Sequence, residues 1–244
     1  MSLKFTYENI DKVIDRSSMI AKEIDPKKIT LLVLDMQPMC NDPEGALYIP
    51  SVGGAPSGQD VIAPVEKVLE RFRQEGSQIV FSQWGLRPDG HDKGICALKW
   101  PALNCGTPES PASWGNPQTD SFSGTLEPRE GEPVVRRSRF SAFQSTALGE
   151  FMRENGSDTL VIAGISTANC VITTTIDAWN QNYKVVVLAD CAAAVPSFHT
   201  DDTPQGYGQH WEFLRNIQMN YGDVITSYEL FGRVEAAKKN LQQA

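Results

Sequence analysis

Short apolar runs recur along the chain and are separated by segments of helical or turn-like composition. The runs lie at residues 30–34, 78–83, 159–163, 184–189 and 223–226, with a shorter one around Val134. Runs of this length, bounded by polar and turn-forming residues, are typical of strands buried on both faces of a parallel sheet. The pattern therefore predicts six strands.

Helical periodicity fills several of the intervals between these strands. A helix is predicted from about Asp60 to Gln74, with Pro64 in its first turn. Its apolar stripe consists of Ile62, Val65, Leu69 and Phe72. Further helices are predicted from about Thr146 and from Cys170. Strands that alternate with helices predict a three-layer α/β/α fold, in which a six-stranded parallel sheet is covered on both faces.

Residues 84–132 lack such periodicity and are rich in Gly, Pro, Asn and Ser. The segment carries the aromatic residues Trp84, Trp100, Trp114 and Phe122. Loops of this length in a compact domain are usually lids or binding loops, and the aromatic side chains favour an ordered one. We expect either a lid over a ligand site or an oligomer interface, and the two interpretations have equal support from the sequence.

The chain of 244 residues, 41% of them apolar, is expected to form a single domain, 1–244, around one sizeable core. Its two ends are predicted to be peripheral. Residues 1–27 are mixed polar and are interpreted as an N-terminal arm, and Glu235–Ala244 should fray.

Charge and hydropathy argue against two classes of partner. The net charge is −8 and no basic run is longer than the pair Arg136 and Arg137, so no face is suited to nucleic acid. No apolar stretch approaches the roughly 20 residues of a membrane span, and the first residues lack the apolar core of a secretory signal. We therefore expect a cytoplasmic protein without a membrane partner. Five cysteines are an odd number, which favours free thiols over a Cys96–Cys105 disulfide in the long loop.

A candidate nucleophile follows the strand at 159–163. A tight turn, residues 164–169, leads to Cys170 at the predicted start of a helix. The free amides and the positive end of a helix dipole favour a thiolate, so we expect the pKa of Cys170 to lie below the usual value of about 8.5. The alternative is a small apolar residue packed at a helix start, which is common for cysteine. Asp35 follows the first strand, at the edge of the sheet where α/β proteins bind ligands. Its position favours the interpretation of Cys170 as a nucleophile.

Three segments occur together in a distinctive order. They are Leu34-Asp35-Met36-Gln37, Ser141-Ala142-Phe143 with Thr146 and Leu148 after it, and Gly164 through Cys170. With these segments the chain resembles the isochorismatase-like cysteine hydrolases, the family of N-carbamoylsarcosine amidase, nicotinamidase and the biuret and ureidoacrylate hydrolases. The resemblance covers roughly residues 29–230. It implies an isochorismatase-like sheet with the strand order 3-2-1-4-5-6.

In that family an aspartate, a lysine and a cysteine form the catalytic triad, and the resemblance places Asp35 and Cys170 in the first and last roles. The middle position, 33 residues before the cysteine, is Arg137. An arginine stays charged and can bridge a carboxylate and a thiolate, but it cannot donate a proton at working pH. The resemblance further implies a cis peptide bond between Ile165 and Ser166, and an oxyanion hole formed by the backbone amides of Ser166 and Cys170.

The resemblance also places Gln37, Trp84, Phe143 and Ile165 around the substrate. Nicotinamidases of the family bind a divalent ion with an aspartate and several histidines, but only His91, His199 and His210 are present here, without ligand spacing. We therefore expect no metal and no other cofactor. His91 is interpreted as a solvated loop residue, His210 as a helix residue beside Trp211, and His199 as a loop residue that could reach the pocket rim but is more simply solvated. Asp190 is expected to close hydrogen bonds at a strand end.

These inferences predict a metal-independent cysteine amidohydrolase that cleaves a small amide, ureido or carbamoyl compound through a thioester. A small-molecule substrate and a homo-oligomer, either a dimer or a tetramer, are the expected partners. Two alternatives stay open. One is isochorismate-type hydrolysis, although the members that perform it lack the cysteine. The other is an inactive binding protein of the same fold, which the replacement of lysine by Arg137 allows.

Overall fold

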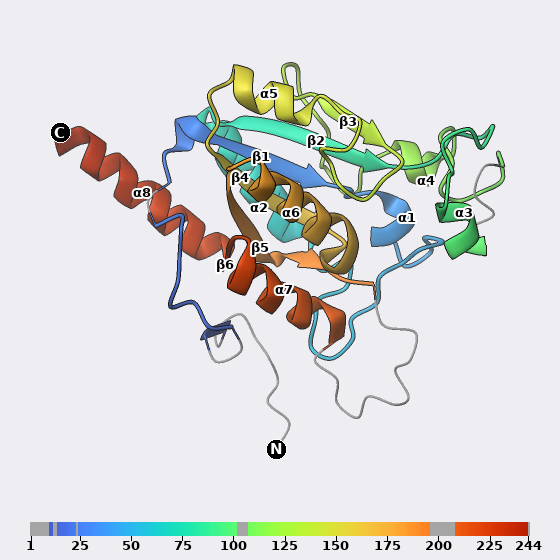
Figure 1. The fold of residues 1–244 in the computed structure, drawn as a ribbon, viewed down its shortest axis with the longest axis horizontal. Coiled ribbons are helices and arrows are strands. Elements are labelled where there is room, and N and C mark those ends of the chain that lie inside the picture. The colour runs from blue at the N-terminus through green and yellow to red at the C-terminus, as the bar shows by residue number, and fades with distance from the viewer. Residues whose placement is uncertain (1–9, 12–13, 23, 102–106, 196–207, 244) are drawn as a thin grey trace.

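The computed structural model describes residues 10–11, 14–22, 24–101, 107–195 and 208–243 (Figure 1). Its centre is a six-stranded parallel sheet with the strand order β3-β2-β1-β4-β5-β6. The strands are β1 (Ile29–Leu34), β2 (Gln78–Trp84), β3 (Val134–Arg137), β4 (Thr159–Ile165), β5 (Lys184–Ala193) and β6 (Asp223–Ile225). The predicted strands and the strand order implied by the family resemblance are both confirmed.

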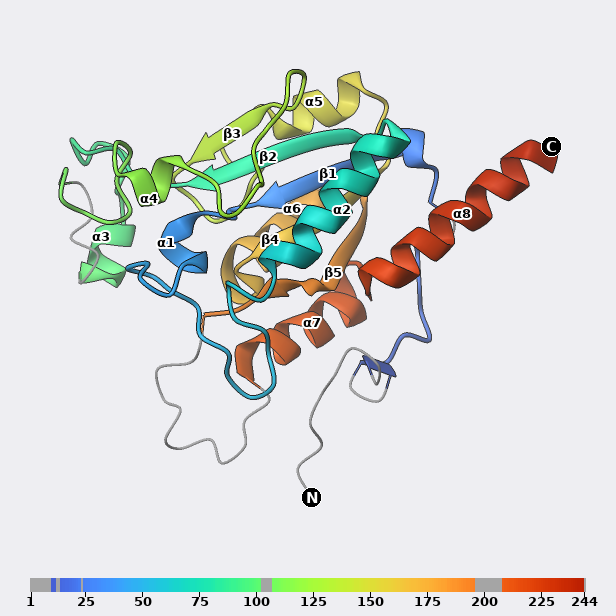
Figure 2. The same cartoon turned by 180° about the vertical axis from the view of Figure 1, so that it is seen from behind.

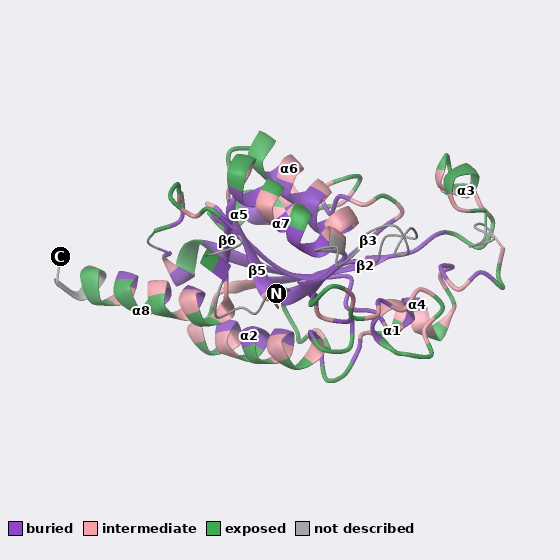
Figure 3. Cartoon of the chain, turned by 90° about the horizontal axis from the view of Figure 1, so that it is seen from below, coloured by how far each residue is buried: buried purple, intermediate pink, exposed green. Residues whose placement is uncertain are grey.

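Helices cover both faces of the sheet, which confirms the three-layer α/β/α architecture. One face carries α5 (Leu148–Glu154), α6 (Ile172–Asn180) and α7 (Gly208–Asn220) (Figure 1). The other face carries α2 (Ile62–Glu75) and α8 (Ser227–Gln243), which Figure 2 shows from behind. The two helical layers lie above and below the buried sheet in Figure 3.

Each face of the sheet has its own hydrophobic cluster. Leu31 and Val33 of β1 belong to the cluster under α2 and α8, whereas Leu32 and Leu34 belong to the cluster under α5, α6 and α7. Successive side chains of a strand point to opposite faces. Because both faces are covered, every position of β1 is buried, and the strand has no polar alternation of the kind that marks a one-sided sheet.

The C-terminal segment differs from the prediction, because the helix α8 continues to Gln243 instead of fraying from Glu235. Val234 and Ala237 on this helix are buried. Lys238 also forms an ion pair with Glu75 of α2. Burial of one apolar stripe is enough to keep a surface helix ordered over its length.

The start of α8 confirms the role expected of Asp190. Its carboxylate accepts hydrogen bonds from the Ser227 backbone N–H at 2.8 Å and from the Ser227 hydroxyl at 2.5 Å. The strand β5 is thereby tied to the first turn of α8. No helix among the described residues is both long enough and apolar enough to cross a membrane.

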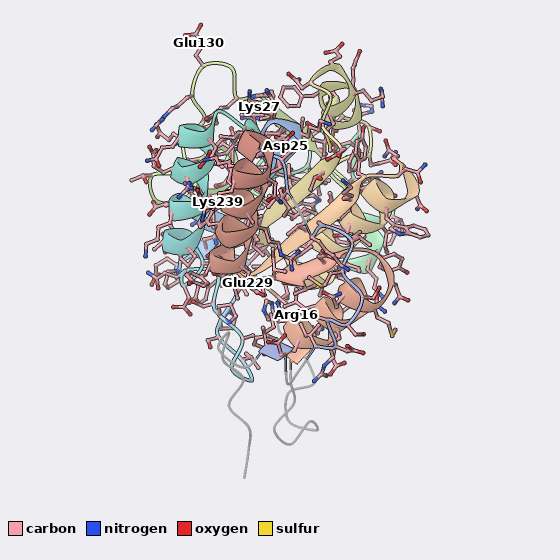
Figure 4. All side chains as sticks on the ribbon, turned by 90° about the vertical axis from the view of Figure 1, so that its left-hand side faces the viewer. Arg16, Asp25, Lys27, Glu130, Glu229 and Lys239 are labelled. Carbon is pink, nitrogen blue, oxygen red and sulfur yellow. The ribbon has the colours of Figure 1, made fainter. Side chains whose placement is uncertain are left out.

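The described part of the N-terminal segment is packed on the domain. Its buried apolar residues are Ile10, Ile14, Ala21 and Ile24. Arg16 donates to both carboxylate oxygens of Glu229 on α8, at 2.6 and 2.7 Å (Figure 4). This segment therefore adds buried side chains to the hydrophobic clusters on the faces of the sheet.

The segment 84–132 extends from the carboxyl edge of the sheet and is ordered where it is described. It contains two short helices, α3 (Cys96–Lys99) and α4 (Pro117–Asp120), and a bridge between Leu86 and Ser113. Leu86 is buried, whereas Ile95 and Leu98 on or next to α3 are 77% and 81% exposed. The lid and interface interpretations both remain predictions. Cys105 lies outside the described residues, so the less favoured alternative of a Cys96–Cys105 disulfide is not tested.

Candidate active site

The carboxyl ends of three strands bring Asp35, Arg137 and Cys170 together. Strands β1 and β4 are neighbours, and Leu34 pairs with Gly164 at their last shared position. The turn after β1, which holds Asp35, therefore lies beside the turn after β4, which leads to Cys170. Arg137 ends β3 at the sheet edge, and its side chain reaches across β2 to the carboxylate.

Gly164 allows these two strands to approach each other just before the site. Its φ of +141° lies outside the range that other residues adopt readily. A Cβ atom at this position would lie 2.0 Å from the backbone oxygen of Leu34. A side chain is therefore sterically excluded where β4 passes β1.

Asp35 is held by both of its carboxylate oxygens. Oδ2 accepts from Nη2 of Arg137 at 2.7 Å, and Oδ1 accepts from the hydroxyl of Ser82 at 3.0 Å. The backbone of Asp35 has a φ of +55°, and its N–H donates to the Ser82 carbonyl at 3.0 Å. Ser82 was not among the predicted site residues. A serine within an apolar strand indicates a buried hydroxyl that needs a hydrogen-bond partner, but the sequence does not identify that partner.

Arg137 is completely buried, with a side-chain exposure of 0%. Its Nη2 donates to Asp35 and also, at 3.0 Å, to the carbonyl of Phe140. Burial lowers the pKa of Arg137, but the Asp35 carboxylate and the Cys170 sulfur outweigh burial and raise it, so the guanidinium stays charged. Nε and Nη1 have no hydrogen-bond partner among the described residues. These N–H groups remain available for negative charge at the sulfur or on a ligand.

Cys170 is buried, with 6% exposure, and its protonation differs from the prediction. Burial raises the pKa of the thiol well above its usual value, the Asp35 carboxylate raises it further, and the Arg137 guanidinium opposes both. The expectation of a lowered pKa from the helix start alone was therefore wrong. Desolvation and the neighbouring Asp35 side chain raise the pKa of the thiol by more than the Arg137 guanidinium lowers it, so the thiol form of Cys170 is favoured.

The turn that carries Cys170 is not the first turn of an α-helix. Residues Thr167–Val171 form a π-helical turn, and α6 begins only at Ile172. The backbone oxygen of Ser166 accepts from the N–H groups of Asn169 and Val171 at 3.0 and 3.1 Å. The peptide bond between Ile165 and Ser166 is cis. Residues 166–170 are called the cysteine turn below.

A profile of the isochorismatase domain matches residues 30–226, which include every residue of this site. The chain belongs to the isochorismatase family. It is 28% identical to the maleamate amidohydrolase of Pseudomonas putida, over 82% of this chain and 84% of that protein. It is 34% identical to a protein of Arabidopsis thaliana named a probable inactive nicotinamidase, over 71% of this chain and 85% of that protein.

A solved structure shows the same fold. The cysteine hydrolase of Pseudomonas syringae pv. phaseolicola superposes with a TM-score of 0.79 at 25% sequence identity, over 91% of this chain and 99% of that chain. The sheet order and the placement of the helices described above are therefore those of an isochorismatase-like hydrolase.

Two of the residues expected around the substrate lie at this edge of the isochorismatase-family sheet. The Gln37 amide donates to the backbone oxygens of Trp84 and Thr119, at 3.0 and 2.6 Å, and accepts from the Trp84 N–H at 2.9 Å. Both amide hydrogens are therefore engaged, and Gln37 fastens the segment 84–132 to the turn after β1 instead of offering a donor to a ligand. Trp84 is 6% exposed, and its Nε1 has no partner among the described residues. Its indole N–H can donate to a ligand.

The other two expected substrate residues are placed differently. Phe143 stacks on Tyr183 at the amino end of β5, with ring centroids 6.2 Å apart, and its role at the substrate stays a prediction. Phe140 contacts the site residues directly, because its carbonyl accepts from Arg137 at 3.0 Å and its ring lies 6.5 Å from that of Trp84. Ile165 is buried in the cluster on the opposite face of the sheet from Cys170, so the side chain serves the core.

The described histidines are separate from one another. His91 is an exposed loop residue whose backbone N–H donates to the Asp89 carboxylate at 3.0 Å. His210 is buried on α7 beside Trp211. His199 lies outside the described residues. Within the part of the chain that the structure describes, no three His, Cys, Asp or Glu side chains gather as metal ligands do.

Proposed function

We propose that this chain is a metal-independent cysteine amidohydrolase that cleaves a carbon–nitrogen bond of a small amide, ureido or carbamoyl compound through a thioester. One observation carries the proposal. Arg137 binds Asp35 at 2.7 Å, and the charges of both residues act on the buried thiol of Cys170. Amidohydrolases with 28% and 31% identity to 82% and 68% of the chain support the same class of reaction.

Asp35 begins the reaction as a general base. It takes the thiol proton as the sulfur attacks the substrate carbonyl, so the thiolate forms only when a bond to carbon forms with it. The raised pKa of the Cys170 thiol requires such a base, because a free thiolate would be scarce near neutral pH. Arg137 keeps its charge throughout and offers its remaining N–H groups to the negative charge that develops.

The backbone amides of Ser166 and Cys170 are proposed to hold the oxyanion of the tetrahedral intermediate. Asp35 then passes the proton to the departing nitrogen, the carbon–nitrogen bond breaks, and a thioester remains on Cys170. Water adds to the thioester with Asp35 again acting as base. The acid is released and the thiol is restored.

Replacement of the nucleophile tests this proposal. Cys170→Ala should reduce ammonia release from a panel of carboxamide, ureido and carbamoyl compounds by about 10³-fold or more. Mass spectrometry of the quenched wild type should show an acyl adduct on Cys170, and the thermal melting of the variant should stay close to that of the wild type. Comparable turnover in Cys170→Ala would refute the cysteine mechanism. A wild-type protein inactive on the whole panel would favour the alternative of a non-catalytic binding protein.

The metal-independent part of the proposal has its own measurement. Arg137 already forms an ion pair with the Asp35 carboxylate, and among the described residues no three His, Cys, Asp or Glu side chains gather as metal ligands do. Treatment with a chelator should leave the rate of hydrolysis unchanged. Activity that is lost on chelation and restored by a divalent ion would contradict this.

A further inference from the structure

His210 is a buried polar residue that the proposed chemistry does not use. It lies on α7 with 1% exposure, and its Nδ1 is 3.0 Å from the hydroxyl of Thr167. Thr167 opens the π-helical turn that carries Cys170. The same hydroxyl donates to the carbonyl of Ala193 at the end of β5, at 3.1 Å. A single hydroxyl therefore connects the cysteine turn to a strand and to a helix that is distant in sequence.

The direction of these two hydrogen bonds is coupled. A hydroxyl has only one hydrogen, and since Thr167 donates it to Ala193, Thr167 must accept from His210. This requires the proton of the imidazole to be on Nδ1 and leaves Nε2 bare. Nε2 is buried and has no partner among the described residues. Burial lowers the pKa of His210 to about 3, so the ring stays neutral at working pH and can keep this one tautomer.

Ser166, the residue before Thr167, is also bound by the chain near the end of β5. Its hydroxyl accepts from the backbone N–H of Val195 at 3.0 Å. Two consecutive hydroxyls therefore fasten the beginning of the cysteine turn to the chain at and beyond the end of β5. Among the described residues, the Thr167 hydroxyl is the one of these two that also binds a side chain, that of His210.

We propose that His210 is a positioning residue for the cysteine turn. Through the Thr167 hydroxyl, it holds the turn where the Cys170 sulfur and the amides of Ser166 and Cys170 face the same carbonyl. The inference rests on the proposed cysteine hydrolase function. His210 does not itself touch the reacting atoms, but a misplacement of about 1 Å in such a site costs roughly 10²-fold in rate.

The proposal predicts a graded series of variants. His210→Ala should lower kcat by about 10²-fold with little change in KM, because the substrate still binds to a turn that is displaced. His210→Asn keeps an N–H at the position of Nδ1 and should restore most of kcat. His210→Gln places its amide one bond further out and should restore less. Equal activity in all three variants and the wild type would overturn the proposal.

The rate of alkylation of Cys170 distinguishes a displaced cysteine turn from a less reactive thiol. A small electrophile needs only the thiolate and not the oxyanion hole, so its rate with His210→Ala should stay within about twofold of the wild type. Thr167→Val should reproduce the kcat of His210→Ala, and the double variant should be no slower than either single one, because both changes break one connection. Additive losses in the double variant would show that the two residues act separately.

Gln218→Ala is the matched control on the same helix. Gln218 is also buried and polar, but it binds the carbonyl of Ser18 and the N–H of Val224, away from the cysteine turn. Its loss should lower the melting temperature and leave kcat unchanged. If kcat follows the melting temperature across the His210, Thr167 and Gln218 variants, the role of His210 is only structural and the proposal fails.

A measurement without turnover distinguishes this proposal from the proposed function. Nitrogen NMR of labelled histidine should show a protonated Nδ1 and a bare Nε2 in the wild type, and the opposite tautomer would refute the connection. The amide resonances of Ser166 and Cys170 should shift in His210→Ala and not in Gln218→Ala. If no amide is hydrolysed, the proposed function fails, while unshifted resonances would show independently that His210 does not position the turn.

Discussion

The two sides of the site are built in different ways. On the strand side, Asp35, Ser82 and Arg137 come from the ends of β1, β2 and β3 and are joined by side-chain hydrogen bonds of 2.7 and 3.0 Å. On the turn side, Cys170 sits on a π-helical turn that is held mainly through backbone groups and the hydroxyls of its neighbours.

This contrast separates two tasks. Burial is the main cause of the raised pKa of the Cys170 thiol, and the charges on the strand side then raise it further through Asp35 and lower it through Arg137. The turn side carries no charge and determines where the sulfur and the amides lie. A change on the strand side should therefore alter both the rate of thiol alkylation and the rate of turnover. A change on the turn side should alter turnover and leave the alkylation rate nearly the same.

The largest effect is expected from Asp35→Asn. Hydrolysis should fall by about 10³-fold, because the general base is lost. Alkylation of Cys170 at pH 7 should nevertheless become faster, since the carboxylate that raises the thiol pKa is gone. The measurements are steady-state hydrolysis and iodoacetamide labelling followed by mass spectrometry. Slower labelling in this variant would mean that Asp35 does not act on the thiol as described.

Stability is the control for Asp35→Asn. The change leaves the buried guanidinium of Arg137 without its ionic partner, and loss of one member of a buried pair typically costs about 3–5 kcal/mol. Both assays should therefore be run well below the melting temperature of the variant.

Arg137 variants should give the next largest effect. Arg137→Met removes the charge that opposes the raised pKa of Cys170, so alkylation should slow and hydrolysis should fall by about 10²-fold. Arg137→Lys keeps the charge and should retain substantial activity. If Arg137 instead binds a substrate carboxylate, the lysine variant should mainly raise KM for acidic substrates. Unchanged labelling and kinetics in Arg137→Met would remove Arg137 from the site.

The pH dependence of labelling tests the protonation of the resting thiol. Because the pKa of Cys170 is raised above its usual value, the thiolate fraction should grow about tenfold for each pH unit from pH 6 to 9, without a plateau. Cys170→Ala supplies the background from the other cysteines. A plateau near neutral pH would indicate a lowered pKa and restore the helix-start expectation.

Ser82→Ala should have the smallest effect of the series. It removes one hydrogen bond of 3.0 Å to Asp35 and leaves the Arg137 bond intact. A neutral hydrogen bond is worth about 1 kcal/mol, so turnover should fall roughly fivefold. Ser82→Thr retains the hydroxyl and is the control. A loss as large as that of Asp35→Asn would mean that Ser82 takes part in the proton transfer itself.

Most of the fold follows from local patterns in the chain. The run from Thr30 to Leu34 is apolar enough to need cover on both faces, and strands alternating with helices have few ways to pack. The frayed end predicted from Glu235 onward was wrong because burial of Val234 and Ala237 depends on a docking surface that only the folded sheet provides.

The residue types of the candidate site can also be found in the sequence, since Asp35 ends a strand and Cys170 follows a strand and a turn. The protonation state of these residues cannot be found in the sequence. The pKa of the Cys170 thiol depends on burial and on charges brought from β1 and β3, and both are sums over neighbours that are distant in the chain.

The same reason explains the residues that were missed. Ser82 and His210 acquire their roles only through contacts with Asp35 and Thr167, 47 and 43 positions away in the chain. A local pattern contains no information about such pairs. Periodicity therefore specifies which segments become strands and helices, whereas packing of those elements specifies which hydroxyl meets which carboxylate or imidazole, because hydrogen bonds and burial act across space and not along the chain.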